Sequence, residues 1–157
     1  MRHSPDGRRE VTGLSGTPEE VRSLVFRYAD AVNRRDEAQW AACWDDDAEW
    51  SLATGRVRGR SSIVDTWRTA MARHRLVMQI VGHGDAWQTP GGWVGRWHFQ
   101  EYGHHEERGV GLLLAWYDDG YGRDAGGALV LTRRVLTPVY HGPPDLSGLG
   151  ESPAVAT

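Results

Sequence analysis

Glu101 is the residue of this chain whose surroundings best suit acid–base chemistry. Side chains two residues apart in a strand point the same way, and the strand predicted over 93–102 places three aromatic side chains on the face that carries Glu101, namely Trp93, Trp97 and Phe99. A carboxyl among aromatic rings has a raised pKa and can give or take a proton. The alternative is a glutamate at a strand end that reaches solvent or pairs with Arg96 or Arg133.

Histidines could supply the second proton-transfer group. His83, in a strand predicted over 76–87, is the first candidate, and the alternative is a hydrogen-bonded histidine at a sheet edge or dimer face. His74 is the second, although a histidine near a helix end is also a favourable cation for the helix dipole. A later polar stretch combines histidines with glutamates: His98, His104, His105, Glu106 and Glu107. These residues lack metalloenzyme spacing such as H-E-x-x-H, so we predict no metal site.

Other polar side chains have simpler explanations. Asp36 is placed to cap a helix, and Asp30 to lie on a solvated helix face. The arginine pair 133–134 could neutralise a substrate carboxylate or a buried aspartate, but surface ion pairing is the simpler expectation. Cys43 lies on an apolar helix face, which predicts a buried and unreactive thiol.

The elements that must position these groups begin with two helices. Residues 1–16 mix charged residues with Gly, Ser and Pro without a period, which predicts a disordered leader. Thr17 can cap the first helix, Pro18 suits its first position and Glu20 completes a capping box. Its apolar face has helical spacing: Val21, Leu24, Val25, Tyr28, Ala29 and Val32. A second, tryptophan-bearing helix is expected to end at the acidic residues 45–47.

The remaining sequence predicts strands around one further helix. Short strands are expected at 48–52 and 56–58, and a third helix, capped by Ser61 or Ser62, from Ile63 to about Arg73. Long strands follow at 76–87, 93–102, 110–117 and 128–139. The first of these is apolar on both faces, so both faces should be covered. We therefore expect one α+β domain over 17–140, in which a strongly curved sheet wraps around helices, and a flexible tail over 141–157.

Composition excludes some partners. The 157 residues carry a net charge of −3 with a pI near 6.1, and the basic residues form scattered pairs, which argues against nucleic acid. One cysteine excludes an internal disulfide and fits a reducing cytoplasm. No apolar run approaches the length of a membrane span. Eight tryptophans against two phenylalanines suit a cavity for ring compounds, or an aromatic core.

The start of the domain resembles a known family. The run Tyr28-Ala-Asp-Ala-Val-Asn33-Arg-Arg-Asp36, followed by a tryptophan-bearing helix and Asp-Asp-Ala-Glu-Trp50, is similar to the opening of SnoaL-like domains. These belong to the nuclear-transport-factor-like superfamily, which includes scytalone dehydratase, hexachlorocyclohexane dehydrochlorinase, ketosteroid isomerase and polyketide cyclases. The resemblance covers about residues 18–146. It implies a cone-shaped α+β domain with a pocket between the first helix, the third helix and the concave sheet face.

The resemblance also implies residue roles. In dehydratase-like members, an aspartate late in the first helix works with a histidine on the third strand. By position these residues fall on Asn33 and near Met78, so an amide that cannot take a proton replaces the usual base. Trp50 takes the place of a tyrosine that positions a water in scytalone dehydratase.

We expect an enzyme that needs no cofactor and acts on a small hydrophobic cyclic molecule in secondary metabolism or catabolism, as an isomerase, dehydratase or cyclase. Glu101 and His83 would transfer protons, while Asn33 and Tyr28 orient the substrate. The predicted lining of the cavity is Trp50, Trp67, Met78, Trp97 and Phe99. The alternative is a binding or assembly domain that keeps the fold without the chemistry. For both we expect a cytoplasmic homodimer.

Overall fold

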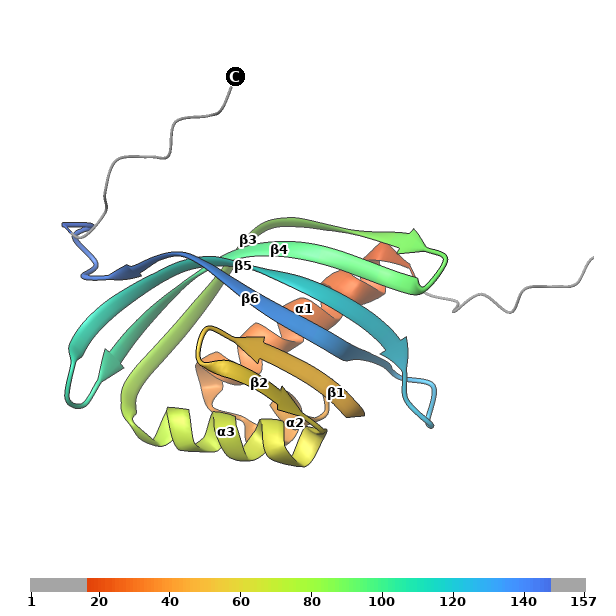
Figure 1. The fold of residues 1–157 in the computed structure, drawn as a ribbon, viewed down its shortest axis with the longest axis horizontal. Coiled ribbons are helices and arrows are strands. Elements are labelled where there is room, and N and C mark those ends of the chain that lie inside the picture. The colour runs from red at the N-terminus through yellow and green to blue at the C-terminus, as the bar shows by residue number, and fades with distance from the viewer. Residues whose placement is uncertain (1–16, 148–157) are drawn as a thin grey trace, which may run out of the picture.

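The computed structural model describes residues 17–147, which form three helices and one six-stranded sheet (Figure 1). The predicted leader and most of the predicted tail, residues 1–16 and 148–157, lie outside the described residues. In chain order the elements are α1 (Pro18–Arg34), α2 (Glu37–Ala41), β1 (Trp44–Leu52), β2 (Gly55–Arg58), α3 (Arg60–Ala72), β3 (His74–Thr89), β4 (Gly92–His105), β5 (Gly109–Arg123) and β6 (Leu129–Gly142).

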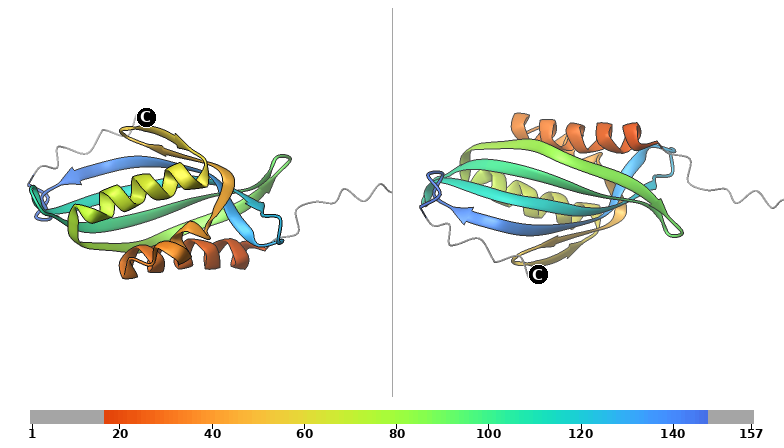
Figure 2. Two further views of the ribbon diagram at one scale, coloured as in Figure 1. Left: turned by 90° about the horizontal axis from the view of Figure 1, so that it is seen from below. Right: turned by 90° about the horizontal axis from the view of Figure 1, so that it is seen from above.

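The sheet is open, mixed and strongly curved. Its strand order is β2-β1-β6-β5-β4-β3, and the pairs are antiparallel except for β1 with β6. The long strands arch over α1 and α3, which lie on the concave side (Figure 1). Seen from above, the convex face of β3–β6 has none of these helices across it (Figure 2). This arrangement confirms the predicted α+β fold with a curved sheet around helices.

The convex face differs from the expectation for the strand over 76–87. Leu76, Met78 and Ile80 point outward from β3 and are 39–49% exposed. The described part of this chain therefore covers the concave face of β3 and leaves its other apolar face accessible.

Helix α1 begins where its sequence indicates. The capping box between Thr17 and Glu20 is formed in both directions, and Arg35 ends the helix in the left-handed region at φ 57°. The predicted apolar face is buried, and α1 packs its length against the sheet (Figure 2). Within residues 17–147, no helix is long and apolar enough to cross a membrane.

The second helix is shorter than its sequence suggests. Asp36 caps it by accepting from the Gln39 amide at 3.0 Å, as predicted. However, α2 ends at Ala41, and the acidic residues 45–47 lie inside β1. The cause is tertiary, because Trp44 pairs with Leu131 of β6 and extended pairing overrides local helix preference.

Helix α3 starts earlier than predicted and without a serine cap. Its N-cap is Gly59, with φ 84° and no side-chain hydrogen bond, and the Gly59 amide donates to the Ala48 carbonyl at 2.8 Å. The prediction that Ser61 or Ser62 caps this helix is therefore wrong. The backbone of β1 fixes the helix start instead.

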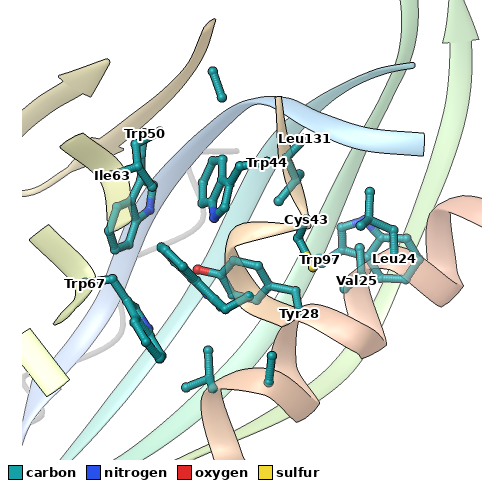
Figure 3. Close-up of a cluster of buried hydrophobic side chains, with 14 of the residues drawn as sticks. Leu24, Val25, Tyr28, Cys43, Trp44, Trp50, Ile63, Trp67, Trp97 and Leu131 are labelled. Carbon is teal, nitrogen blue, oxygen red and sulfur yellow. The ribbon is translucent and has the colours of Figure 1, made fainter. Parts of the chain in front are cut away.

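Tryptophans fill the space between α2, α3 and the sheet (Figure 3). Trp40 stacks on Trp67 with ring centroids 4.8 Å apart, and meets Trp44 and Trp50 edge-on at 5.5 and 5.6 Å. All four rings are at most 7% exposed. Cys43 lies beside them and is buried, as expected. Trp50 and Trp67 therefore belong to a packed aromatic core, and they do not line an open cavity.

Candidate active site

The concave face of the sheet has two halves. The deep half lies around Arg134 and Asp119, which form a buried ion pair. Arg134 Nε and Nη2 donate to Asp119 Oδ1 and Oδ2 at 2.8 and 2.6 Å, and these side chains are 1% and 0% exposed. The guanidinium lies between the rings of Tyr28 and Tyr117, 4.2 and 4.1 Å from their centroids. Tyr121 donates a further hydrogen bond to Asp119 at 2.8 Å. The pair is therefore held by hydrogen bonds and cation–π contacts together.

Little open space remains in the deep half. The cavity bounded by Tyr28, Tyr117 and Arg134 has a volume of about 10 Å³, which is room for at most one water. Burial raises the pKa of both tyrosines. Burial also opposes the charge of Arg134, but the Asp119 carboxylate outweighs it and raises the pKa of the guanidinium. The expectation of surface ion pairing is wrong for Arg134, which stabilises the interior.

Glu101 is the carboxyl of the mouth half, which comprises the concave positions of β4 from Glu101 to His105 and their neighbours on β3, β5 and β6. Its Oε2 accepts a hydrogen bond from Gln79 Nε2 at 2.7 Å. Burial raises the pKa of Glu101, and the Gln79 bond and the nearby His74 and His141 offset this only in part. The predicted raised pKa is thus present, although an amide is the bonded partner.

A cavity of about 320 Å³ opens beside Glu101. This volume is at the lower end for sites that bind small molecules. Its titratable and charged side chains are Glu101, His74, His105, His141 and Arg108. Within residues 17–147, no group of three or more His, Cys, Asp or Glu side chains is placed to bind a metal ion.

The strand register brings the carboxyl and the imidazoles together. Glu101 pairs with Leu113 of β5, and Leu113 pairs with His141 of β6. His74 begins β3, and its ring meets that of His105 edge-on with centroids 5.0 Å apart. A carboxyl of raised pKa beside imidazoles can take a proton from a bound molecule and return one.

Asn33 is bonded to the edge strand β3. Its Nδ2 donates to the Gln79 carbonyl at 2.9 Å, and its Oδ1 accepts from the Gln79 amide at 2.6 Å. Because the Gln79 side chain bonds Glu101, Asn33 is connected to that carboxyl through a single residue. An aspartate in its place could accept from the amide but could not donate to the carbonyl. The two hydrogen bonds to the Gln79 backbone therefore explain the amide side chain at this position.

The structure does not bring His83 to Glu101. A β-bulge shifts the β3–β4 register between Val81 and Gly84, so His83 faces His98 on the convex side. The exposed His83 ring stacks on the His98 ring with centroids 4.1 Å apart. Without the bulge, simple alternation would have placed His83 on the concave face. The structure separates the two predicted groups, and the histidines that line the cavity with Glu101 include His74 and His141.

The other predicted lining residues also divide between regions. Met78 is 39% exposed on the convex face. Trp97 and Phe99 do lie on the concave face, but both are buried in the deep half. Trp97 donates to the Tyr121 hydroxyl at 2.9 Å. Tyr28 is 2% exposed among tryptophans and Arg134, so its ring is part of the packing and not of the open cavity.

Four functional or structural polar residues were missed from the sequence. The strands predicted over 93–102, 110–117 and 128–139 end before His105, Asp119 and His141, whereas β4, β5 and β6 continue through them. Gln79 lies in the strand predicted over 76–87, but no role was predicted for it. The signal that could have found His105 is the period of two that starts at Glu101, because strands extended by four residues carry it into the same cavity.

The fold and this cavity define a cone-shaped α+β domain with titratable groups on the concave face of its sheet. The family model described as a SnoaL-like domain matches residues 17–134, and the chain belongs to that family. A comparison with curated protein sequences finds no match.

Solved structures share the fold. A hexachlorocyclohexane dehydrochlorinase (LinA, type 2) is 20% identical with a TM-score of 0.73, covering 87% of this chain and 93% of its own. A candidate scytalone dehydratase from Novosphingobium aromaticivorans is 16% identical with a TM-score of 0.71, covering 86% and 94%. The ActVI-ORFA protein of Streptomyces coelicolor is 20% identical with a TM-score of 0.60, covering 77% and 96%. At these identities, the likeness is one of fold.

Proposed function

We propose that this protein is a cofactor-independent acid–base enzyme that moves a proton on a small cyclic molecule held in the mouth cavity. The observation that carries the proposal is the carboxyl of Glu101. It is held by one amide, its pKa is raised by burial, and it lies beside His74 and His141 at a cavity of about 320 Å³. A carboxyl of raised pKa beside imidazoles is suited to proton transfer.

The proposed reaction starts at a ring carbon next to a carbonyl group. The Glu101 carboxylate takes the proton from that carbon, and the electron pair of the C–H bond moves to the carbonyl oxygen as an enolate. The imidazole of His141 then gives a proton to a second carbon, which completes an isomerisation, or to a departing oxygen, which completes a dehydration. No external reductant or oxidant is needed for either outcome.

The names of the structural neighbours support this class of reaction. Loss of hydrogen chloride from a hexachlorocyclohexane and loss of water from scytalone both require removal of a proton from carbon, and proteins carrying these names share the fold. In this chain an amide occupies the helix position of the usual base, so we assign the proton transfer to β4 and its neighbours instead.

Proton exchange tests the proposal without a known substrate. Cyclohexanone, cyclohexenone and tetralone are incubated with the protein in D₂O, and loss of the α-proton signal is followed by NMR. We expect exchange above the buffer rate for at least one ketone, and a loss of about 10²–10⁴-fold in Glu101→Gln, the typical contribution of a general base.

His83→Ala is the matched control, because it removes an exposed imidazole on the other face of the sheet. Its exchange rate should equal that of the unchanged protein. Equal rates in Glu101→Gln and the unchanged protein, or no exchange with any ketone, would refute the proposal.

A non-catalytic binding domain is the second candidate function. The observation in its favour is the closed deep half, where only about 10 Å³ is left between α1 and the sheet. In that case, ring compounds would bind in the mouth cavity without any exchange, and the exchange experiment separates the two functions.

A further inference from the structure

The floor of the mouth cavity contains a pair of glycines near the hairpin end of β4 and β5. Gly103 of β4 pairs with Gly111 of β5, between the pair Glu101–Leu113 and the pair His105–Gly109. Glycine weakens a strand interior, and it often marks a place where a ligand approaches the backbone closely. Both glycines line the cavity. The backbone of Gly111 is therefore open to the cavity, whereas the His74 ring covers Gly103, where a Cβ would lie 3.4 Å from His74 Cδ2.

The outer end of this floor presents hydrogen-bond donors. His105 Nδ1 accepts from the amides of Glu107 and Arg108 at 3.1 and 3.3 Å. Burial and the neighbouring Arg108 lower the pKa of His105. Because Nδ1 accepts these two hydrogen bonds, it keeps its lone pair, and the ring carries its proton on Nε2. The exposed guanidinium of Arg108 lines the same part of the cavity.

The inner end of the floor presents proton acceptors. His74 Nδ1 lies 2.9 Å from the Ala70 carbonyl, which can only accept, so Nδ1 carries the proton and Nε2 is left with its lone pair. Nε2 faces the floor, 3.6 Å from the place where a Cβ on Gly103 would lie. Glu101 lies at the same end. The cavity is thus polarised, with acceptors inside and donors outside.

We propose that the ligand of this cavity is a single-ring carboxylic acid. Its ring lies on Gly111 beside the His74 ring, its carboxylate binds Arg108 and the Nε2–H of His105, and its far ring carbon faces Glu101. Four residues of strand separate Glu101 from His105, about 13 Å between their Cα atoms. This span leaves room for one ring between the two side chains. Only the reaction of the ring carbon at Glu101 rests on the proposed function. The proposed binding of the carboxylate and the ring does not depend on it.

The chemistry of the carboxylate follows from charge. A guanidinium and a carboxylate form the strong type of hydrogen bond. A neutral amide of the same shape lacks the charge and presents N–H groups to donors. The separation from Glu101 along the strand limits repulsion between the two carboxyls.

Binding of two matched probes tests this inference by calorimetry with the full chain. Cyclohexanecarboxylate should bind about 10-fold or more tightly than cyclohexanecarboxamide, the usual scale for a charged hydrogen bond. Arg108→Gln should abolish this preference, whereas Arg22→Gln, an exposed arginine on α1, should preserve it. Equal affinities for the two probes, a preference that survives Arg108→Gln, or no binding of either probe at millimolar concentration would overturn the inference.

The glycine floor has its own variant. A Cβ on Gly111 would meet only the Gly142 carbonyl oxygen at 3.8 Å, which is ordinary contact, so Gly111→Ala should fold normally. We expect it to weaken cyclohexanecarboxylate binding about 10-fold, because the methyl group occupies the ring position. Gly91→Ala is the control, with the same 3.8 Å of room in the turn between β3 and β4, and binding should not change. Unchanged binding in Gly111→Ala would overturn the proposed floor.

Binding of cyclohexanecarboxylate in Glu101→Gln should persist. Loss of proton exchange without loss of binding in this variant therefore separates the two proposals.

Discussion

The two halves of the concave face each hold one inward-facing carboxyl, and they use it differently. Asp119 is 0% exposed and is bonded by Arg134 through two hydrogen bonds and by Tyr121 through a third. Glu101 has one amide bond and an adjoining cavity of about 320 Å³. The difference shows that a buried charge whose bonds are all satisfied serves packing, whereas a carboxyl with a neutral partner and open space beside it can exchange its proton.

The largest expected effect is on the deep half. Asp119→Asn should lower the free energy of unfolding by about 3–5 kcal/mol, because it leaves the Arg134 guanidinium buried without its counter-ion. Chemical denaturation followed by tryptophan fluorescence measures this. Glu101→Gln is the matched control, a carboxyl-to-amide change on the same face, and it should leave the protein folded and at least as stable at neutral pH. Equal losses in the two variants would remove the distinction between the halves.

A smaller effect is expected at the link between α1 and β3. Asn33→Asp removes the donor to the Gln79 carbonyl and places a carboxylate against that oxygen. We expect a loss of about 1–3 kcal/mol, the cost of leaving a partly buried group unsatisfied. We also expect a shifted pH profile of proton exchange, because Gln79 holds Glu101.

Asp30→Asn on the same helix is the control for this change. Its side chain is 55% exposed and forms an (i, i+4) pair with Arg34, so its effect on stability should stay within about 0.5 kcal/mol. If Asn33→Asp were as mild, the hydrogen bonds to Gln79 would not be what requires an amide at this position.

Local patterns were enough to predict α1 and the faces of regular strands. The capping box at Thr17 and the apolar spacing of α1 are formed as predicted, and Glu101 shares the concave face with Trp97 and Phe99, as alternation indicates. These features depend on residues a few positions apart. They can therefore be recognised without knowing which strands pair.

Features that depend on pairing with distant strands could not be predicted. The bulge before Gly84 turns His83 to the convex face, and no residue type near it fixes the register. Asp119 pairs with Arg134 on the neighbouring strand. Local sequence patterns do not show which residue lies opposite it. The strand extensions that bring His105 and His141 into the cavity likewise depend on their neighbours in β5 and β6.

The smallest expected effect concerns stability and pH at Glu101. Because burial raises its pKa, the folded protein keeps a proton that the unfolded chain releases above about pH 4.5. The unfolded state then binds fewer protons, so this residue lowers stability as pH rises from its ordinary pKa to its raised one. The Glu101→Gln variant has no carboxyl at this position, so its stability does not decrease for this reason. Its stability relative to the unchanged protein should therefore increase through that pH window and be constant below it.

Glu37→Gln gives the opposite sign in the same measurement. The hydrogen bond from Arg68 lowers the pKa of this exposed carboxylate, so its stabilising contribution is present above the ordinary pKa and disappears as pH falls through the lowered value. The Glu37→Gln variant should lose stability relative to the unchanged protein on the neutral side and approach it in acid. Denaturation curves between pH 3 and 8 compare the three proteins. Parallel curves for Glu101→Gln and the unchanged protein would mean that Glu101 ionises in the folded state as it does in the unfolded chain, and the mouth half would then have no group prepared to exchange a proton near neutral pH.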